Sequence, residues 1–126
     1  VPNGTFQLLD FREPLPFSDK QFDGIWCAGS LLHVPKKQLP QILEEIYRIL
    51  KSTGILYCSF KKGKNEVLEQ EEGGERFFAY YLPSELTEYF KKANFEIISL
   101  EPSHGHADPK MTWIQIFSKK KIQGEF

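Results

Sequence analysis

The sequence has few cysteines, no long apolar run and no excess of charge of one sign. Its two cysteines, Cys27 and Cys58, lie inside apolar segments, which indicates buried free thiols in a reducing compartment rather than a disulfide framework. No stretch reaches the roughly 18 apolar residues of a membrane span, and the N-terminus lacks the pattern of a signal peptide. The 16 basic and 17 acidic side chains nearly cancel, so nothing electrostatic favours nucleic acid or a membrane as partner. These absences favour a cytoplasmic globular protein.

The length and composition suit one modest hydrophobic core. A chain of 126 residues with 40% hydrophobic and 14% aromatic content predicts a single domain over residues 1–126. The chain opens with Val1 in the turn-like phrase Val1-Pro2-Asn3-Gly4, and not with methionine. We therefore expect the natural start to lie upstream.

Continuous apolar segments predict buried strands. Residues 5–9 suit a short strand that leads into a proline-containing loop at Asp10. Residues 22–28 are apolar on both alternating faces, as in a central strand of a parallel sheet covered by helices on both sides. Residues 55–60 form a second strand of this kind.

Two amphipathic segments predict helices. Apolar residues recur at three- and four-residue spacing over residues 39–51, and Gly54 is expected to end this helix in a positive-φ turn. Ser84 suits the N-cap of a second helix, and Asn94 suits the left-handed residue that ends it.

The remaining segments complete an α/β fold. Residues 61–74 are polar and aperiodic, which predicts a loop or frayed helix that either lies over a ligand site or is mobile. Residues 95–100 and 111–118 predict two strands, and the ten residues between them are too few for a crossover, so the strands should be antiparallel. The expected architecture is a mostly parallel α/β sheet with an antiparallel last strand and helices on its faces.

A series of short motifs follows a fixed order from about Phe6 to Ser118. The series comprises Asp10, Leu15-Pro16-Phe17, Phe22-Asp23, Leu31-Leu32-His33, Glu44-Glu45-Ile46-Tyr47-Arg48-Ile49-Leu50-Lys51, Gly54, residues 78–81, and Ala93-Asn94-Phe95-Glu96-Ile97-Ile98. No single motif is diagnostic, but the ordered set resembles small class I S-adenosylmethionine-dependent methyltransferases. The resemblance implies a partial Rossmann-like sheet and S-adenosyl-L-methionine as cofactor.

One part of the family pattern is missing. The family begins with a strand, a glycine-rich loop and a helix, and the glycines let the backbone approach the cofactor closely. No such glycine cluster precedes a helix here, because Gly73-Gly74 lies in a charged segment. The resemblance therefore covers only the C-terminal part of a methyltransferase domain, and we expect the isolated chain to be inactive.

The resemblance assigns cofactor-binding roles to four residues. Asp10 would accept a hydrogen bond from the adenine amino group, with Phe11 beside the ring; a loop aspartate that bonds nearby amides is the alternative. Ala28 and Gly29, at the carboxyl end of the central strand, would approach the methionine moiety, although Gly29 could also be a simple turn residue.

The acceptor side has less specific candidates. His33 is the candidate catalytic base, with a structural or capping role as the alternative. Arg76, Tyr80 and Tyr81 belong to an aromatic cluster that could form a substrate-binding wall or pack under the last helix.

Other polar groups are weaker candidates. Ser59, Lys61 and Lys62 leave a strand at the same edge, but solvated lysines are the simpler interpretation. The segment His104-Gly105-His106-Ala107-Asp108 has too few ligands for a metal site, so we expect a hairpin loop and no metal.

Three functions remain open on the sequence alone. The first is methyl transfer to an unidentified acceptor, with a small molecule favoured over tRNA. The second is a non-catalytic methyltransferase-like binding module, with homodimerisation through an exposed sheet edge. The third is a fragment of another nucleotide-binding enzyme, such as a dehydrogenase.

Overall fold

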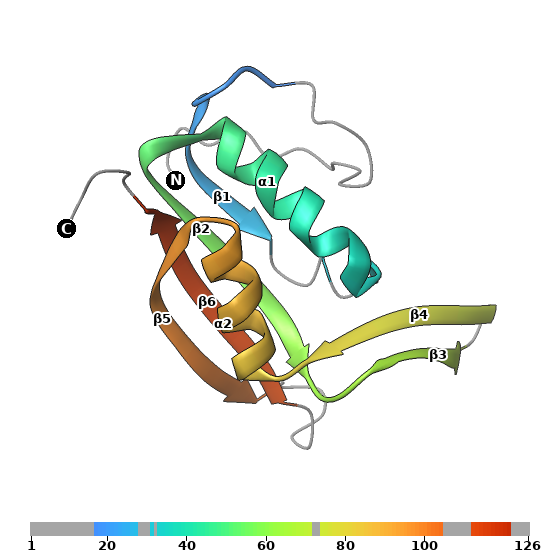
Figure 1. The fold of residues 1–126 in the computed structure, drawn as a ribbon. Helices are drawn as coiled ribbons and strands as arrows, with labels where there is room; N and C mark the ends of the chain where they lie inside the picture. Colours follow the sequence, from blue (N-terminus) through green and yellow to red (C-terminus); the bar gives the residue numbers. More distant parts are fainter. Residues whose placement is uncertain (1–16, 28–30, 32, 72–73, 105–111, 122–126) are drawn as a thin grey trace.

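A computed structural model describes residues 17–27, 31, 33–71, 74–104 and 112–121 of the chain (Figure 1). The predicted strand at residues 5–9 lies outside this part. The elements are β1 (Phe22–Cys27), the 3-10 helix η1 (Lys36–Gln38), α1 (Leu39–Ile49), β2 (Leu50–Lys62), β3 (Glu66–Glu71), β4 (Gly74–Tyr81), α2 (Pro83–Lys92), β5 (Phe95–His104) and β6 (Thr112–Lys120). Neither described α-helix has the length and apolar content needed to cross a bilayer.

The strands form a mixed six-stranded sheet centred on β2. The order is β3-β4-β2-β6-β5, and β1 also pairs with β2. β1 runs parallel to β2, and β4 joins β2 in parallel only at Lys61 and Lys62. β6 lies between β2 and β5 and is antiparallel to both. The predicted α/β class with an antiparallel last strand is confirmed.

Both α-helices cover the same face of the sheet (Figure 1). The apolar stripe predicted for α1 is buried, and α2 contributes Leu86 and Phe90 to the same core. Facing them, the alternate residues Leu56, Cys58 and Phe60 of β2 are fully buried. Burial of these stripes is the main source of the fold's stability, because removing apolar surface from water is the dominant favourable term in folding.

The other face of the sheet carries a row of aromatic side chains. Trp26, Tyr57 and Phe117 are register neighbours on β1, β2 and β6, and the Trp26 and Tyr57 rings stack with centroids 3.9 Å apart. On this face Trp26 is 62% exposed, Ile55 is 38% exposed and Ile98 is 53% exposed. The prediction that the strand at Trp26 is buried on both faces is therefore not met within the described residues, where both helices lie on one side.

Gly54 corrects the prediction for the end of α1. The helix ends at Ile49, and β2 begins at Leu50, so Gly54 lies inside a strand rather than in a positive-φ turn. A Cβ atom on Gly54 would lie 2.5 Å from Leu50 Cδ1 and 3.0 Å from the Asp23 carbonyl oxygen. The glycine is required for close approach of β1 and β2 and not for a turn.

The ends of α2 differ in how well the sequence predicted them. Asn94 has a φ of 65° and follows the helix, as predicted. The helix begins at Pro83 with Leu82 as N-cap, so Ser84 lies in the first turn and is not the cap. The Leu82 N–H donates to Glu85 Oε1 at 3.0 Å, which satisfies one of the free amides of the helix start.

The segment predicted as a loop or frayed helix, residues 61–74, contains the end of β2 and the first strand of a β-hairpin instead. Residues Glu66–Glu71 pair antiparallel with Gly74–Tyr81, and Asn65 turns the chain into β3 with a φ of 70°. β3 is polar and aperiodic on its own, so its strand conformation depends on the aromatic β4 beside it. Strand formation of this kind reflects packing against a neighbour more than intrinsic propensity.

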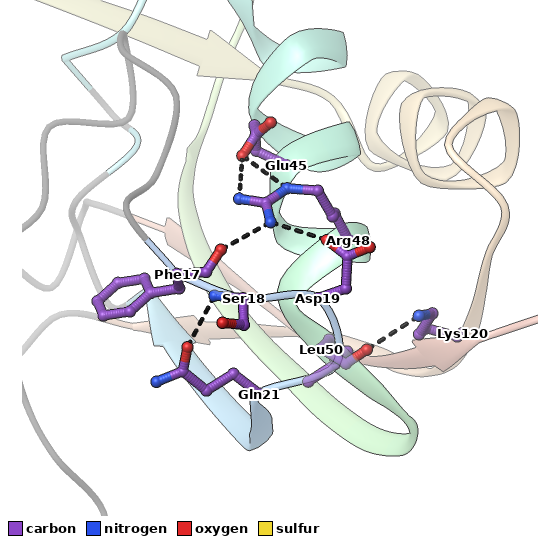
Figure 2. Close-up of polar contacts among 8 residues, drawn as sticks. All are labelled: Phe17, Ser18, Asp19, Gln21, Glu45, Arg48, Leu50 and Lys120. Atoms are coloured by element: carbon purple, nitrogen blue, oxygen red, sulfur yellow. Dashed lines mark hydrogen bonds and ion pairs between the residues drawn. The ribbon is translucent and has the colours of Figure 1, made fainter.

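Arg48 holds the segment that leads into β1 (Figure 2). Its Nη1 donates to the Phe17 carbonyl oxygen at 2.7 Å and to Asp19 Oδ1 at 2.9 Å, while Glu45 accepts from its other nitrogens. On the far side of β2, buried Lys120 donates to the Leu50 carbonyl oxygen at 2.9 Å. These bonds attach β1 and β6 to the junction between α1 and β2.

Candidate functional site

The parallel pair β1 and β2 defines one edge of the sheet. Trp26 is the register partner of Tyr57, and Cys27 is the partner of Cys58, so the carboxyl ends of the two strands point the same way. Ligands of open α/β sheets bind outside the carboxyl ends of the strands. The prediction that residues 22–28 and 55–60 form strands of a parallel sheet is confirmed for this pair.

The four predicted cofactor-binding residues lie outside the described residues; two of them directly follow β1 in the sequence and two precede it. These residues are Asp10, Phe11, Ala28 and Gly29. Their described neighbours are well held: Cys27 is 1% exposed, and Leu31 is equally buried in the core. Arg48 fixes the residues that lead into β1 by its bonds to Phe17 and Asp19.

The two cysteines at this edge are free and buried, as predicted. Burial raises the pKa of the Cys58 thiol, and the adjacent Cys27 raises it further. A thiol in this setting stays protonated and is a poor nucleophile. The chemistry of the edge therefore belongs to other side chains.

His33 lies in an exposed turn after β1 and reaches across to β4. Its Nδ1 is 2.8 Å from the Phe77 carbonyl oxygen, although the two residues are 44 positions apart. Its ring centroid lies 4.7 Å from that of Phe78, whose side chain is 4% exposed. The histidine thus lies at the carboxyl edge of the sheet, with one side of its ring held by the hairpin.

Lys61 packs against the phenyl ring of Phe78, which His33 also contacts. Its Nζ is 4.5 Å from the centroid of Phe78 and 5.6 Å from that of Trp113. A lysine ammonium on aromatic faces is attracted by the ring quadrupoles. Lys61 is therefore partly packed rather than freely solvated. Lys62, in contrast, is exposed. Ser59, the third polar candidate on this strand, is buried at 7% exposure.

The structure separates two of the three predicted substrate-binding residues, Tyr80 and Tyr81. Tyr80 is half-buried and stacks on Phe78 with centroids 6.2 Å apart, close to His33 and Lys61. Tyr81 is 1% exposed and packs against Phe60, so its ring has no surface left for an acceptor, and burial raises its pKa. The backbone of Arg76 pairs with Glu69 in the hairpin, and its side chain lies outside the described part.

A charged bridge ties the hairpin to the segment that follows His33. The Lys36 N–H donates to Glu66 Oε2 at 3.1 Å, and Lys36 Nζ forms an ion pair with Glu85 Oε2 at 3.0 Å. Partial burial acts to raise the pKa of Glu85, but the hydrogen bond from the Leu82 N–H and the nearby Lys36 ammonium outweigh it, so the pKa of Glu85 is lowered. β3, η1 and α2 are thereby held together beside the candidate site.

Sequence patterns alone did not reveal the cluster of His33, Lys61, Phe78 and Trp113. In the sequence Phe78 belongs to an aromatic run and Trp113 to a predicted strand, and neither pattern indicates a contact with His33 or Lys61. The contacts depend on β6 lying beside β2, where Lys61 faces Trp113 in register, and on the unpredicted hairpin. The sequence contained no signal for either pairing.

The arrangement of this fold is that of known methyltransferase structures. A methyltransferase from Methanosarcina mazei superimposes with a TM-score of 0.80 at 20% identity, over 94% of this chain and 68% of that one. A protein from Pyrococcus horikoshii gives 0.72 at 21% identity, over 94% and 60%. An N1-methyltransferase from Burkholderia thailandensis, solved with 1,6-didemethyltoxoflavin and S-adenosylhomocysteine, gives 0.72 at 18% identity, over 84% and 47%.

The family match adds sequence evidence to the shared fold. Residues 2–58 match the model of the methyltransferase domain family. No curated protein sequence matches the chain significantly. The chain spans 68%, 60% and 47% of the three similar structures, in the order given above. Fold and family match together confirm the resemblance to class I S-adenosylmethionine-dependent methyltransferases.

Proposed function

We propose that this chain forms the C-terminal part of a domain that transfers a methyl group from S-adenosyl-L-methionine to a small-molecule acceptor. The observation that carries the proposal is the parallel pairing of β1 and β2, which brings Cys27 and Cys58 together at the carboxyl edge. In the sequence the small residues Ala28 and Gly29 follow β1 directly, and small side chains there would let a ligand approach the backbone. A cytoplasmic location agrees with the two free buried thiols.

Two segments of this chain would bind different parts of the cofactor. Asp10 and Phe11 would hold the adenine, and Ala28 and Gly29 would approach the methionine moiety. The bound cofactor supplies an activated methyl group on a sulfonium, so the protein has mainly to align the acceptor and exclude water. His33 and Tyr80, with Arg76 from the same hairpin, would form the acceptor side.

A small molecule is the favoured acceptor. The Burkholderia relative was solved with a small molecule bound together with S-adenosylhomocysteine. A tRNA acceptor would need many cationic contacts to phosphate, and the 16 basic side chains of this chain are outnumbered by 17 acidic ones.

Cofactor binding to the isolated chain should be selective but weak. We expect S-adenosylhomocysteine to bind with a dissociation constant above about 1 mM, because the sequence has no glycine-rich loop to add the remaining contacts. Titration followed by backbone NMR should shift signals near Cys27, His33 and Lys61. NAD⁺ at the same concentration should leave these signals unchanged.

Two outcomes would contradict the proposal. Equal or larger shifts with NAD⁺ would favour a dehydrogenase-like fragment. Shifts confined to the groove between α1 and α2, which Tyr47, Glu88 and Tyr89 line, would place the nucleotide site elsewhere. Micromolar affinity would overturn only the expectation of weak binding.

A second candidate function is a homodimerisation module. Among the described residues β1 pairs with β2 alone, and the adjoining face exposes Trp26, Ile55 and Ile98. An uncovered strand edge beside an apolar face favours association. A second copy suits this surface, because the face also carries the Glu96–Lys119 ion pair, with both charge signs, and the net charge of −1 causes little repulsion between copies.

Light scattering on the purified chain tests this alternative. We expect the native chain to be dimeric and the Trp26→Glu variant to be monomeric, because a carboxylate would be buried in the interface. Leu68→Glu is the matched control, since Leu68 is 67% exposed on β3, away from the aromatic face, and its variant should stay dimeric. A native chain that remains monomeric at high concentration would rule out this function.

A further inference from the structure

The contact between His33 and the Phe77 carbonyl oxygen determines where the imidazole carries its proton. A carbonyl oxygen only accepts hydrogen bonds, so the 2.8 Å contact requires a proton on Nδ1 of His33. In the neutral ring the lone pair then lies on Nε2. We infer that the β3–β4 hairpin acts as a positioning device that sets the tautomer of His33 and makes Nε2 the proton acceptor at the carboxyl edge.

The hairpin holds the ring at two points. Besides the bond to Phe77, the imidazole packs on Phe78 with centroids 4.7 Å apart and an interplanar angle of 56°. Phe78 is 4% exposed, so its ring is itself held in place by its surroundings. A hydrogen bond together with a packed ring restricts both the rotation and the flip of the imidazole.

The hairpin is in turn anchored to the chain just after His33. Glu66 of β3 accepts from the Lys36 N–H at 3.1 Å, and Lys36 Nζ pairs with Glu85 of α2 at 3.0 Å. The chain just after His33 is therefore held to β3, and β3 pairs with β4, the strand that carries Phe77. This anchoring makes the His33 orientation a property of the fold and not of one bond.

The second ring nitrogen of His33, Nε2, carries the lone pair of this tautomer. Within the described residues no group forms a hydrogen bond with Nε2, and His33 is exposed in its turn. With no partner among the described residues, Nε2 at the carboxyl edge fits a group that receives a proton.

The position of His33 Nε2 indicates the chemical class of the methyl acceptor. This part of the inference rests on the proposed methyl transfer. The acceptor should be a hydroxyl or an amine, whose oxygen or nitrogen lone pair forms the new bond to the methyl carbon. The carbon–sulfur bond breaks and its electron pair stays on sulfur, while the O–H or N–H proton passes to His33 Nε2 and then to water. An acceptor without such a proton, for example a thioether, would gain nothing from this histidine.

The tautomer can be measured on the full chain without cofactor or acceptor. Long-range ¹H–¹⁵N NMR of the imidazole at a pH where it is neutral should show the proton of His33 on Nδ1, and His33→Gln identifies the signals. Free histidine favours the proton on Nε2, so a spectrum with His33 protonated on Nε2, or an even mixture, would overturn the inference. Because no ligand is involved, this result is independent of whether the chain binds S-adenosylhomocysteine.

A pair of hairpin variants tests whether the hairpin sets the tautomer of His33. Phe78→Leu removes the ring under the imidazole and should cause a loss of the Nδ1 preference, whereas Leu68→Ala, on the exposed side of the same hairpin, should retain it. A Phe78→Leu chain that folds and keeps the native tautomer would contradict the role of the ring. If that variant does not fold, the tautomer in the native chain and in Leu68→Ala still decides the inference.

Discussion

Replacing Phe90 by alanine should lower the free energy of unfolding by about 3–5 kcal/mol, the usual cost of removing a buried phenylalanine. Phe90 of α2 is fully buried, and its ring lies 6.3 Å from that of Phe60 on β2 and 5.9 Å from that of Phe95 on β5. It therefore joins the helix to two strands of the sheet. Collapse around the missing ring is restricted, because the strands on that side are held by the β6 ladder.

Urea unfolding followed by circular dichroism measures this loss. Glu88→Ala is the control on the same helix, since Glu88 is exposed and its variant should change stability by less than about 0.5 kcal/mol. A loss below about 1 kcal/mol for Phe90→Ala would mean that α2 does not pack as described.

The Gly54→Val variant should cost about 2–3 kcal/mol, in the upper part of the range for overpacked cores. The first carbon of the new side chain would lie 2.5 Å from Leu50 Cδ1 and 3.0 Å from the Asp23 carbonyl oxygen. Leu50 is fully buried and cannot move freely, and the second contact is with backbone of β1. The two strands would have to separate at their paired start.

Thr53→Val provides the matched control for this variant. Thr53 precedes Gly54 on β2 and is exposed, so the same new side chain there should change stability only slightly. NMR of Gly54→Val should also show disturbed amide signals from Asp23 to Cys27. Native-like stability and unchanged β1 signals would contradict the close approach of the two strands, on which the proposed cofactor edge depends.

Elements with strong periodicity were predicted well. The apolar spacing of residues 39–51 and the continuous apolar runs at β1 and β2 describe structure that each segment largely determines locally. Asn94 belongs to the same category, because few residues other than glycine adopt a φ of 65° readily. The boundaries were less accurate, as the start of β2 at Leu50 illustrates.

The β3–β4 hairpin and the role of Gly54 could not be predicted from local pattern. β3 has no apolar alternation, so its conformation follows from pairing with β4. Gly54 was assigned to a turn because glycine usually signals one, whereas the packing of Leu50 against β1 decides its role. In both cases the deciding partner lies elsewhere in the chain.

The sequence by itself determined α1, α2 and the strands β1, β2, β5 and β6 in their order, together with the two buried thiols and the motif series that resembles the methyltransferases, because these depend on residue type and short spacing. Only the tertiary structure decided which side chains meet at the carboxyl edge. His33 reaches Phe77 across 44 residues, and Lys61 faces Trp113 because β6 lies between β2 and β5. Contacts of this kind arise when strands pair, since pairing aligns residues whose separation along the chain carries no local signal.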